Sequence, residues 1–293
     1  MTVTELAVAQ AVVAPSPTLA SAIVVLPTYN EAGNIGAILN ALLAVDERID
    51  VVVVDDSSPD GTAAIADAVA GEHPGRVHVL RRPAKSGLGS AYRSGFTWAT
   101  RQGYELIVQM DADGSHPTDR LPAMLDLAET RVADLVVGSR YIPGGRTEGW
   151  PLHRRLLSRA ANTYARSVLG LALHDPTGGF KVWRAAALSV ADPIATTTDG
   201  YGFQVELAVA AERRGLRVIE TPITFTDRTI GESKMTSGIA VEAVRKLWAL
   251  RRRGLRLRPG APALSVATPG LGAVPRIHSS WVGPEAEKGG PRG

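Results

Sequence analysis

Short runs of apolar residues without polar alternation are the feature that most constrains this fold. They span residues 22–26, 49–54, 77–80, 106–110 and 135–138, and a longer segment with helical spacing follows each one. A strand that is apolar throughout is buried on both faces, which is typical of parallel sheets covered by helices. The pattern therefore predicts an α/β fold with a mostly parallel central sheet and helices on both faces.

The remaining segments divide the chain into one folded domain and two tails. Helices are expected over residues 35–42, 62–69, 89–100, 121–128, 152–169 and 203–214, and extended chain over 217–225. A basic amphipathic helix is expected at about 237–253. Residues 1–20 and the Gly- and Pro-rich residues 254–293 lack periodicity and are expected to be a disordered leader and a disordered tail. The domain is thus expected to span residues 21–253.

Composition narrows the chemistry. The 293 residues include no cysteine, which excludes disulfides, thiolate metal sites and a cysteine nucleophile. The net charge of +3 suits anionic ligands or a membrane surface and does not indicate nucleic acid. We find no run of apolar residues of transmembrane length and no basic residue ahead of the apolar stretch 6–14, so the protein is expected in the cytosol.

Acidic residues stand where the predicted strands end, which is the ligand-binding edge of such sheets. Asp111 and Asp113 directly follow the apolar run 106–110. Oxygen ligands of this kind suit Mg²⁺ or Mn²⁺, which can in turn carry a diphosphate. Carboxylates also occur at strand ends because the chain re-enters water, but the shared sheet with Asp56 favours a metal site. The following His116-Pro117 is more typical of a turn than of a ligand.

The segment after the second strand offers two different acids. Asp56 is expected to accept hydrogen bonds from a ribose or a base, whereas Asp60 fits the cap of the next helix. The glycines of the segment 85–89 suit a phosphate at a helix N-terminus. The third glycine of a dinucleotide-binding fingerprint would fall on Tyr92, which disfavours an NAD site.

Cations follow the later strands. Arg140 ends a buried strand on the expected ligand side, whereas Arg155, Arg159 and Arg166 recur at helical intervals typical of a solvated face. Arg228 and Lys234 lie in a glycine-containing loop of a composition that often closes over phosphates.

In this order the motifs resemble those of the polyprenol-phosphate (dolichol-phosphate) mannose synthases, which are inverting family 2 glycosyltransferases with a GT-A fold. The resemblance covers roughly residues 21–250. It rests on PTYNE at 27–31, VVDDSSPDGT at 53–62, MDAD at 110–113, GSRY at 138–141, TGGFK at 177–181 and RTIGESKM at 228–235.

The resemblance implies transfer of mannose from GDP-mannose to a polyprenyl phosphate, with Mg²⁺ or Mn²⁺ as cofactor. It implies metal ligation by Asp111, Asp113 and Ser115, the last standing where some relatives carry Gln, and lipid-phosphate binding by Arg140, Arg154 and Ser158. Asp113, Arg140, Arg228 and Lys234 are the implied catalytic residues. The implied nucleotide-sugar contacts are Pro27, Tyr29, Glu31, Val54, Asp56, Asp111, Ala112, Asp113, Arg228 and Lys234.

The acceptor chemistry separates this reading from its rivals. A phosphate monoester is largely ionised at pH 7 and needs no general base. A family 2 enzyme acting on a hydroxyl would need one, for which Glu206 or Asp199 is available. A UDP-glucose-type donor and a non-catalytic nucleotide-sugar binding module are further alternatives.

The lipid acceptor implies a peripheral position at the cytoplasmic face of a membrane. Residues 244–253 combine apolar side chains, Trp248 and five cations. This helix is expected either to lie on an anionic membrane surface or to dock a membrane-anchoring partner protein. Packing of the helix on the domain core is an equally weighted alternative.

Overall fold

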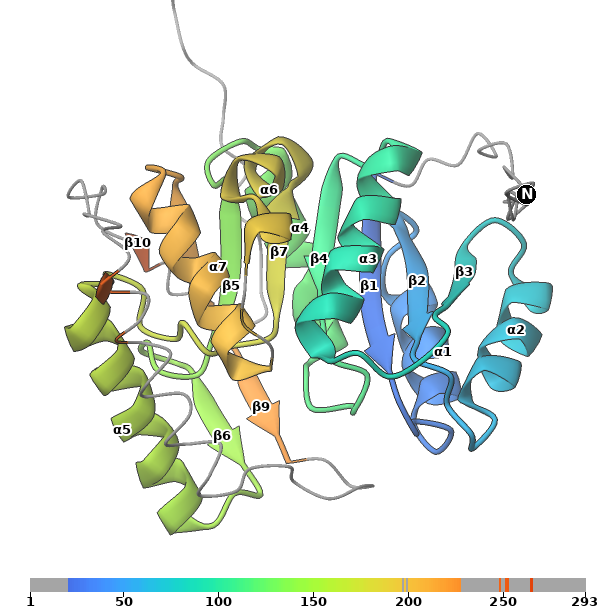
Figure 1. Cartoon of the computed structure of the whole chain (residues 1–293), viewed down its shortest axis with the longest axis horizontal. Helices are drawn as coiled ribbons and strands as arrows, with labels where there is room; N and C mark the ends of the chain where they lie inside the picture. The colour runs from blue at the N-terminus through green and yellow to red at the C-terminus, as the bar shows by residue number, and fades with distance from the viewer. Residues whose placement is uncertain are drawn as a thin grey trace, which may run out of the picture.

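The computed structural model describes residues 21–196, 198, 200–227, 248, 251–252 and 264–265. Its centre is a sheet with the strand order β10-β8-β5-β7-β4-β1-β2-β3 (Figure 1). β7 runs antiparallel to both of its neighbours, and the other pairings are parallel. These strands are β1 (Ala22–Thr28), β2 (Ile49–Asp55), β3 (Val77–Arg81), β4 (Leu106–Gln109), β5 (Leu135–Ser139), β7 (Lys181–Arg184), β8 (Val218–Pro222) and β10 (Leu264–Ser265). A separate parallel pair joins β6 (Arg146–Glu148) to β9 (Thr224–Thr226).

Helices cover both faces of the sheet, which confirms the predicted fold class. One core contains side chains of α1 (Ile35–Val45), α2 (Thr62–Glu72) and α4 (Leu121–Glu129). The other contains side chains of α3 (Leu88–Gln102), α6 (Ala185–Ala191) and α7 (Tyr201–Arg213). A third, small cluster joins α5 (Leu152–Leu169) to α7. Two short 3₁₀ turns, η1 (Thr118–Arg120) and η2 (Pro193–Ala195), complete the described elements.

β1 shows why the strands lack alternation. Val24 and Leu26 face the core under α1, whereas Ile23 and Val25 face the core under α3. All four side chains are fully buried, so neither face of the strand has room for a polar residue. The strand also continues through Pro27 to Thr28, beyond its predicted end. Pairing with β4 stops at Val25, so Pro27 lies where β1 pairs with β2 alone.

β7 was not predicted from the sequence. It is four residues long, begins with Lys181 and is inserted between β4 and β5. Since β7 runs against its neighbours, its first residue lies at the edge where β4 and β5 end. Lys181 is accordingly in register with Gln109 of β4 and Val137 of β5.

The expected basic helix near the C-terminus lies mostly outside the described residues. Trp248, Arg251 and Arg252 are helical, and Trp248 Nε1 donates to the Tyr164 hydroxyl of α5 at 2.8 Å. Arg251 donates to the Val168 carbonyl of the same helix at 3.2 Å. The expected leader also lies outside the described residues, as does the expected tail except for β10. In the part of the chain that the structure describes, we find no helix both long and apolar enough to cross a membrane.

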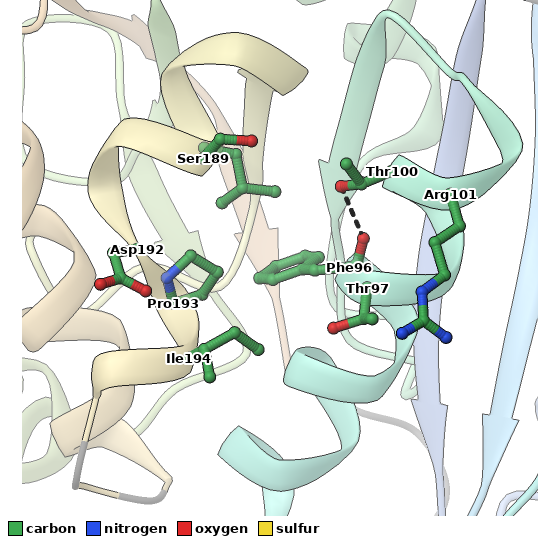
Figure 2. A pocket seen from close by; sticks show the side chains of 9 residues that line it. Phe96, Thr97, Thr100, Arg101, Ser189, Asp192, Pro193 and Ile194 are labelled. Atoms are coloured by element: carbon green, nitrogen blue, oxygen red, sulfur yellow. Dashed lines mark hydrogen bonds between the residues drawn. The ribbon is translucent and has the colours of Figure 1, made fainter.

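A pocket of about 280 Å³ opens between α3 and the segment α6–η2 (Figure 2). Its wall includes Phe96 and Thr100 on one side and Leu188, Pro193 and Ile194 on the other. None of the site residues expected from the sequence lines this pocket.

Candidate functional site

The candidate site lies at the sheet edge to which the arrow of β1 points (Figure 1). The parallel register brings the ends of β1 and β2 together, with Thr28 opposite Asp55. β4 and β5 end on either side of the start of β7. The segments that follow β2, β4 and β5 therefore place Asp56, Asp111 and Arg140 at one edge.

Asp111 is held from two sides. The Tyr92 hydroxyl, on α3, donates to Asp111 Oδ1 at 2.8 Å. Gly179 packs so closely on the other oxygen that a Cβ at this position would lie 2.8 Å from Asp111 Oδ2. Burial alone would raise the pKa of Asp111, but His116, the Tyr92 hydroxyl and the charge of Lys181 outweigh it and lower the pKa. Asp111 is therefore an anion at neutral pH.

Asp113 lies near the same point. Its carboxylate accepts the Ser115 N–H at 3.1 Å, and its charge acts on Tyr92 together with that of Asp111. In the described ranges, we find no group of three or more His, Asp or Glu side chains that could hold a metal ion. Two carboxylates nevertheless fit Mg²⁺ or Mn²⁺, because such ions often take the rest of their ligands from water and substrate phosphates. Ser115 is buried beside Asp113, and its role as a third ligand stays a prediction.

The ring of His116 is buried in an aromatic contact. It stacks on Phe180 at 5.2 Å and meets Phe225 edge-on at 5.2 Å between ring centroids. Its Nε2 lies 3.7 Å from Asp111 Oδ2. His116 thus packs against the Asp111 segment and two aromatic rings.

The predicted nucleotide side contains two acids with different partners. Asp55 accepts the Thr28 hydroxyl at 2.9 Å and the Ser58 N–H at 2.9 Å, so it ties β1 to the segment after β2. Asp56 accepts Arg82 Nη1 at 2.6 Å and the Ser86 N–H at 3.2 Å.

Further contacts shape the loops on this side. Asp60 accepts the Ala32 N–H at 3.0 Å and the Thr62 N–H at 3.1 Å, which links the loops after β1 and β2. Lys85 Nζ lies 3.8 Å from the centre of the Tyr29 ring. Glu31 accepts the Asn34 side-chain amide at 2.9 Å. Pro27 and Val54 are buried within their strands, and their implied contact with a nucleotide stays a prediction.

Arg140 is anchored by hydrogen bonds to Asp175 and Thr177. It is 7 % exposed, and its guanidinium donates to both oxygens of the fully buried Asp175 at 2.7 Å. It also donates to the Thr177 hydroxyl at 2.9 Å. Burial would raise the pKa of Asp175, but the charge and hydrogen bonds of Arg140 lower it. Glu220 of β8 in turn accepts the backbone N–H of His174 at 2.8 Å and of Asp175 at 3.0 Å.

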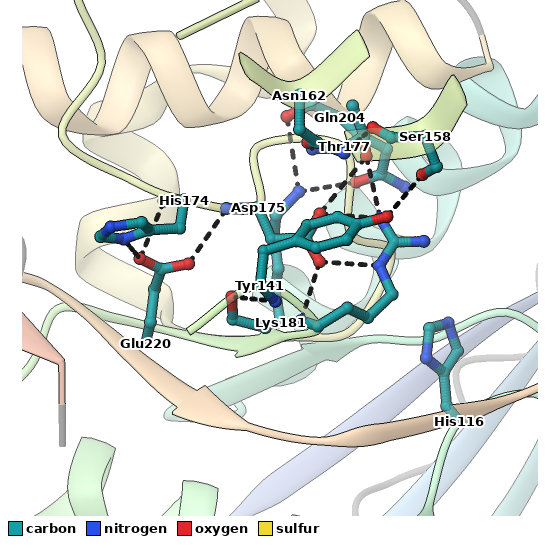
Figure 3. Close-up of polar contacts among 12 residues, drawn as sticks. His116, Tyr141, Ser158, Asn162, His174, Asp175, Thr177, Lys181, Gln204 and Glu220 are labelled. Atoms are coloured by element: carbon teal, nitrogen blue, oxygen red, sulfur yellow. Dashed lines mark hydrogen bonds and ion pairs between the residues drawn. The ribbon is translucent and has the colours of Figure 1, made fainter. Parts of the chain in front are cut away.

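The other two residues implied in lipid-phosphate binding lie on α5. Arg154 pairs with Asp227 at 2.9 Å and lies 4.2 Å from the Trp150 ring centre. The Ser158 hydroxyl accepts the Tyr141 hydroxyl at 2.6 Å, and Tyr141 directly follows Arg140 (Figure 3). These two hydrogen-bonded pairs connect α5 to the segments after β5 and β9.

Three of the implied or alternative residues remain without a structural account. Arg228, Lys234 and Asp199 lie outside the described residues. Glu206, the other alternative base, accepts the Thr198 N–H at 3.1 Å and its hydroxyl at 2.7 Å.

The sequence reasoning missed the partners that hold these groups. Tyr92, Arg82, Asp175 and Glu220 had no assigned role. Lys181 had none either, although it is fully buried and donates to Gln204 Oε1 at 2.8 Å. A charged residue next to the apolar pair Val182-Trp183 was the available signal for a buried cation at a strand end.

Comparison with known proteins shows the family to which this chain belongs. The model of glycosyl transferase family 2 matches residues 23–190, more than half of the chain. A mannosyltransferase from Pyrobaculum calidifontis, solved with GDP-Man and Mn²⁺, shares the fold with a TM-score of 0.58 at 20% identity. That likeness covers 84% of this chain and 68% of the other. The chain belongs to glycosyltransferase family 2, and its fold is GT-A.

Curated relatives resolve the class further. The chain is 45% identical to a polyprenol monophosphomannose synthase of Mycolicibacterium smegmatis, over 80% of this chain and 89% of the relative. It is 47% identical to an undecaprenyl-phosphate mannosyltransferase of Micrococcus luteus, over 80% of this chain and 98% of the relative. The predicted resemblance to polyprenol-phosphate mannose synthases is confirmed.

Proposed function

We propose that this glycosyltransferase transfers mannose from GDP-mannose to a polyprenyl phosphate with inversion at the sugar. The bond between the sugar C1 and the diphosphate oxygen breaks, and its electron pair leaves with GDP. A phosphate oxygen of the acceptor forms the new bond to C1. The observation that carries the proposal is the meeting of Asp111, Asp113 and Arg140 at one sheet edge, supported by the names of the relatives.

The donor end is assigned to Asp111 and Asp113. These carboxylates would hold Mg²⁺ or Mn²⁺ against the diphosphate, where the ion stabilises the negative charge of the leaving group. Asp56 and Tyr29 lie beside the cations Arg82 and Lys85, a polar environment suited to the nucleoside. Arg228 and Lys234 are proposed to neutralise the phosphates from the loop that carries them.

The acceptor end is assigned to Arg140, Arg154 and Ser158. The ionised lipid phosphate attacks without a general base, so the protein has to position it rather than deprotonate it. Glu206, which accepts two hydrogen bonds from Thr198, is given no part in this reaction.

Membrane association is proposed to be peripheral, at the cytoplasmic face. α5 carries Ser158 and Arg154 and exposes Leu152, Leu156 and Leu157 on its surface by more than half of each side chain. Leucines beside arginines suit the boundary between lipid headgroups and acyl chains. A membrane-anchoring partner protein is the alternative to direct contact with the bilayer.

A substrate screen tests the proposal. Purified protein is given nucleotide sugars, Mg²⁺ or Mn²⁺, and a short polyprenyl phosphate, and lipid-linked sugar is followed. The expected result is a β-linked mannosyl phosphate lipid formed from GDP-mannose alone. A product with the α linkage, or transfer from a UDP sugar at the same rate, would contradict it.

The hydroxyl-acceptor rival has its own test. Glu206→Gln is expected to leave turnover with polyprenyl phosphate within a few fold of the parent. Loss of turnover with unchanged donor binding would instead favour an enzyme that uses Glu206 as its base.

A further inference from the structure

Tyr92 stands out among the buried polar groups that the proposed reaction does not use. It lies on α3, is fully buried, and its hydroxyl donates to Asp111 Oδ1 at 2.8 Å. The Tyr92 hydroxyl is therefore the donor of this hydrogen bond, and the Asp111 carboxylate is the acceptor.

The buried ring of Tyr92 packs against two other aromatic rings. It stacks on Phe96 at 5.5 Å and on Phe203 at 5.8 Å between ring centroids. The hydroxyl is therefore presented by a rigid aromatic cluster that links α3 to α7. A donor held in this way constrains the rotamer of the carboxylate that accepts from it.

The opposite side of Asp111 is closed by the backbone. At Gly179 a Cβ would lie 2.8 Å from Asp111 Oδ2 and 3.2 Å from Asp111 Cγ. Because Gly179 has no side chain, the Asp111 carboxylate has room beside it. The hydrogen bond from the Tyr92 hydroxyl then fixes the orientation of this carboxylate.

We propose that Tyr92 is a positioning residue of the metal site, which orients the Asp111 carboxylate for a divalent cation. The inference rests on the proposed function, since it takes Asp111 and Asp113 as the metal ligands. Hydrogen-bond partners of metal-binding carboxylates and imidazoles typically contribute about 10- to 100-fold in metal affinity.

The chain contains a matched control for this hydrogen bond. Tyr104, just beyond the end of α3, donates its hydroxyl to the buried Asp50 Oδ2 at 2.8 Å. Asp50 belongs to β2 but lies near the start of that strand, at the edge of the sheet opposite the site. Tyr92→Phe and Tyr104→Phe thus remove the same kind of bond, and only one of them touches Asp111.

The test measures the dissociation constant of Mn²⁺ in the presence of saturating GDP, by electron paramagnetic resonance of the free ion. Tyr92→Phe is expected to weaken Mn²⁺ binding about 10-fold or more, and Tyr104→Phe to leave it within twofold of the parent. Gly179→Ala, which pushes on Asp111 Oδ2 and leaves the Tyr92 hydroxyl in place, is expected to weaken it as well. Equal Mn²⁺ affinity in Tyr92→Phe and the parent would overturn the inference.

Two further measurements separate this inference from the proposed function. Melting temperatures of the two Tyr→Phe variants show whether a general loss of stability accompanies weaker binding. If only Tyr92→Phe loses stability, its Mn²⁺ affinity is measured at a temperature at which this variant is fully folded, and affinity equal to that of the parent there overturns the inference. Asp111→Asn with Asp113→Asn is expected to abolish Mn²⁺ binding. If that double variant binds Mn²⁺ like the parent, the proposed metal site itself is wrong, whatever Tyr92→Phe does.

Discussion

Lys181 is an ionisable side chain in a fully buried position at the start of β7. Burial lowers the pKa of Lys181 to about 7, although the charges of Asp175 and Asp111 oppose this shift. Between this value and the ordinary lysine pKa of 10.5, the unfolded chain binds a proton at Lys181 that the native protein lacks. The free energy of unfolding should therefore rise with pH across this window.

Urea unfolding of the parent and of Lys181→Met measures this effect. From pH 7 to about pH 9, the parent should gain stability relative to the variant by up to about 1.4 kcal/mol per pH unit. The difference between the two proteins isolates Lys181 from the other groups that titrate. If the free energies of unfolding of the two proteins change with pH in parallel, the pKa of Lys181 is the same in the native and unfolded states, and the prediction is wrong.

The acids at the strand ends show which features of single residues can be predicted from the sequence. The positions of Asp111 and Asp113 after an apolar run were sufficient to predict their place at the ligand edge. The different partners of Asp55 and Asp56 were not predictable, because Thr28 and Arg82 reach them from segments more than 20 residues away. Tyr92 was missed for the same reason, since only the packing of α3 on the sheet brings it to Asp111.

At the scale of elements, α3 lies unusually close to the sheet. A Cβ at Gly95 would lie 2.3 Å from Val25 Cγ1 of β1 and 3.0 Å from Val54 Cγ2 of β2. Gly95 therefore permits a close approach that carries Tyr92, one turn earlier in α3, over the end of β4.

Gly95→Ala is expected to destabilise the protein by about 1–3 kcal/mol, because overpacking of the core outweighs the better helix propensity of alanine. The matched control is Gly71→Ala in α2, where no atom lies within 4 Å of the added Cβ. That control should be neutral or gain up to about 1 kcal/mol. Urea unfolding measures both, and equal effects at the two glycines would refute the close approach of α3.

Some helices and strands could be predicted from the sequence, and others could not. Residues 152–169 form a helix with the predicted bounds, and the strands β1 to β5 appear where apolar runs predicted them. β7 escaped prediction because four residues with a lysine at their start carry little periodic signal. Its place between β4 and β5 depends on tertiary pairing, which the local pattern does not encode.

At the scale of the whole molecule, the proposed reaction joins a water-soluble donor to a lipid. We expect the protein to float with vesicles that contain phosphatidylglycerol, through the exposed leucines and the arginines of α5. Leu156→Ser with Leu157→Ser should weaken vesicle binding at least about tenfold, since two exposed leucines lose their apolar contact with lipid.

Ile194→Ser is the control for vesicle binding, because Ile194 is 62% exposed but belongs to η2 rather than to α5. It should bind vesicles like the parent. If both variants float as the parent does, α5 is not the membrane-binding surface.

The most direct measurement is mannose transfer from GDP-mannose to a short polyprenyl phosphate by Asp111→Asn with Asp113→Asn. Asp119→Asn is the control, since Asp119 is an exposed acid of the nearby η1 turn. We predict that the double variant loses at least about 10²-fold in rate, that EDTA abolishes the parent's activity, and that Asp119→Asn matches the parent. Transfer by the double variant at the parent's rate, or activity that persists in EDTA, would contradict a metal-assisted departure of the nucleotide at this sheet edge.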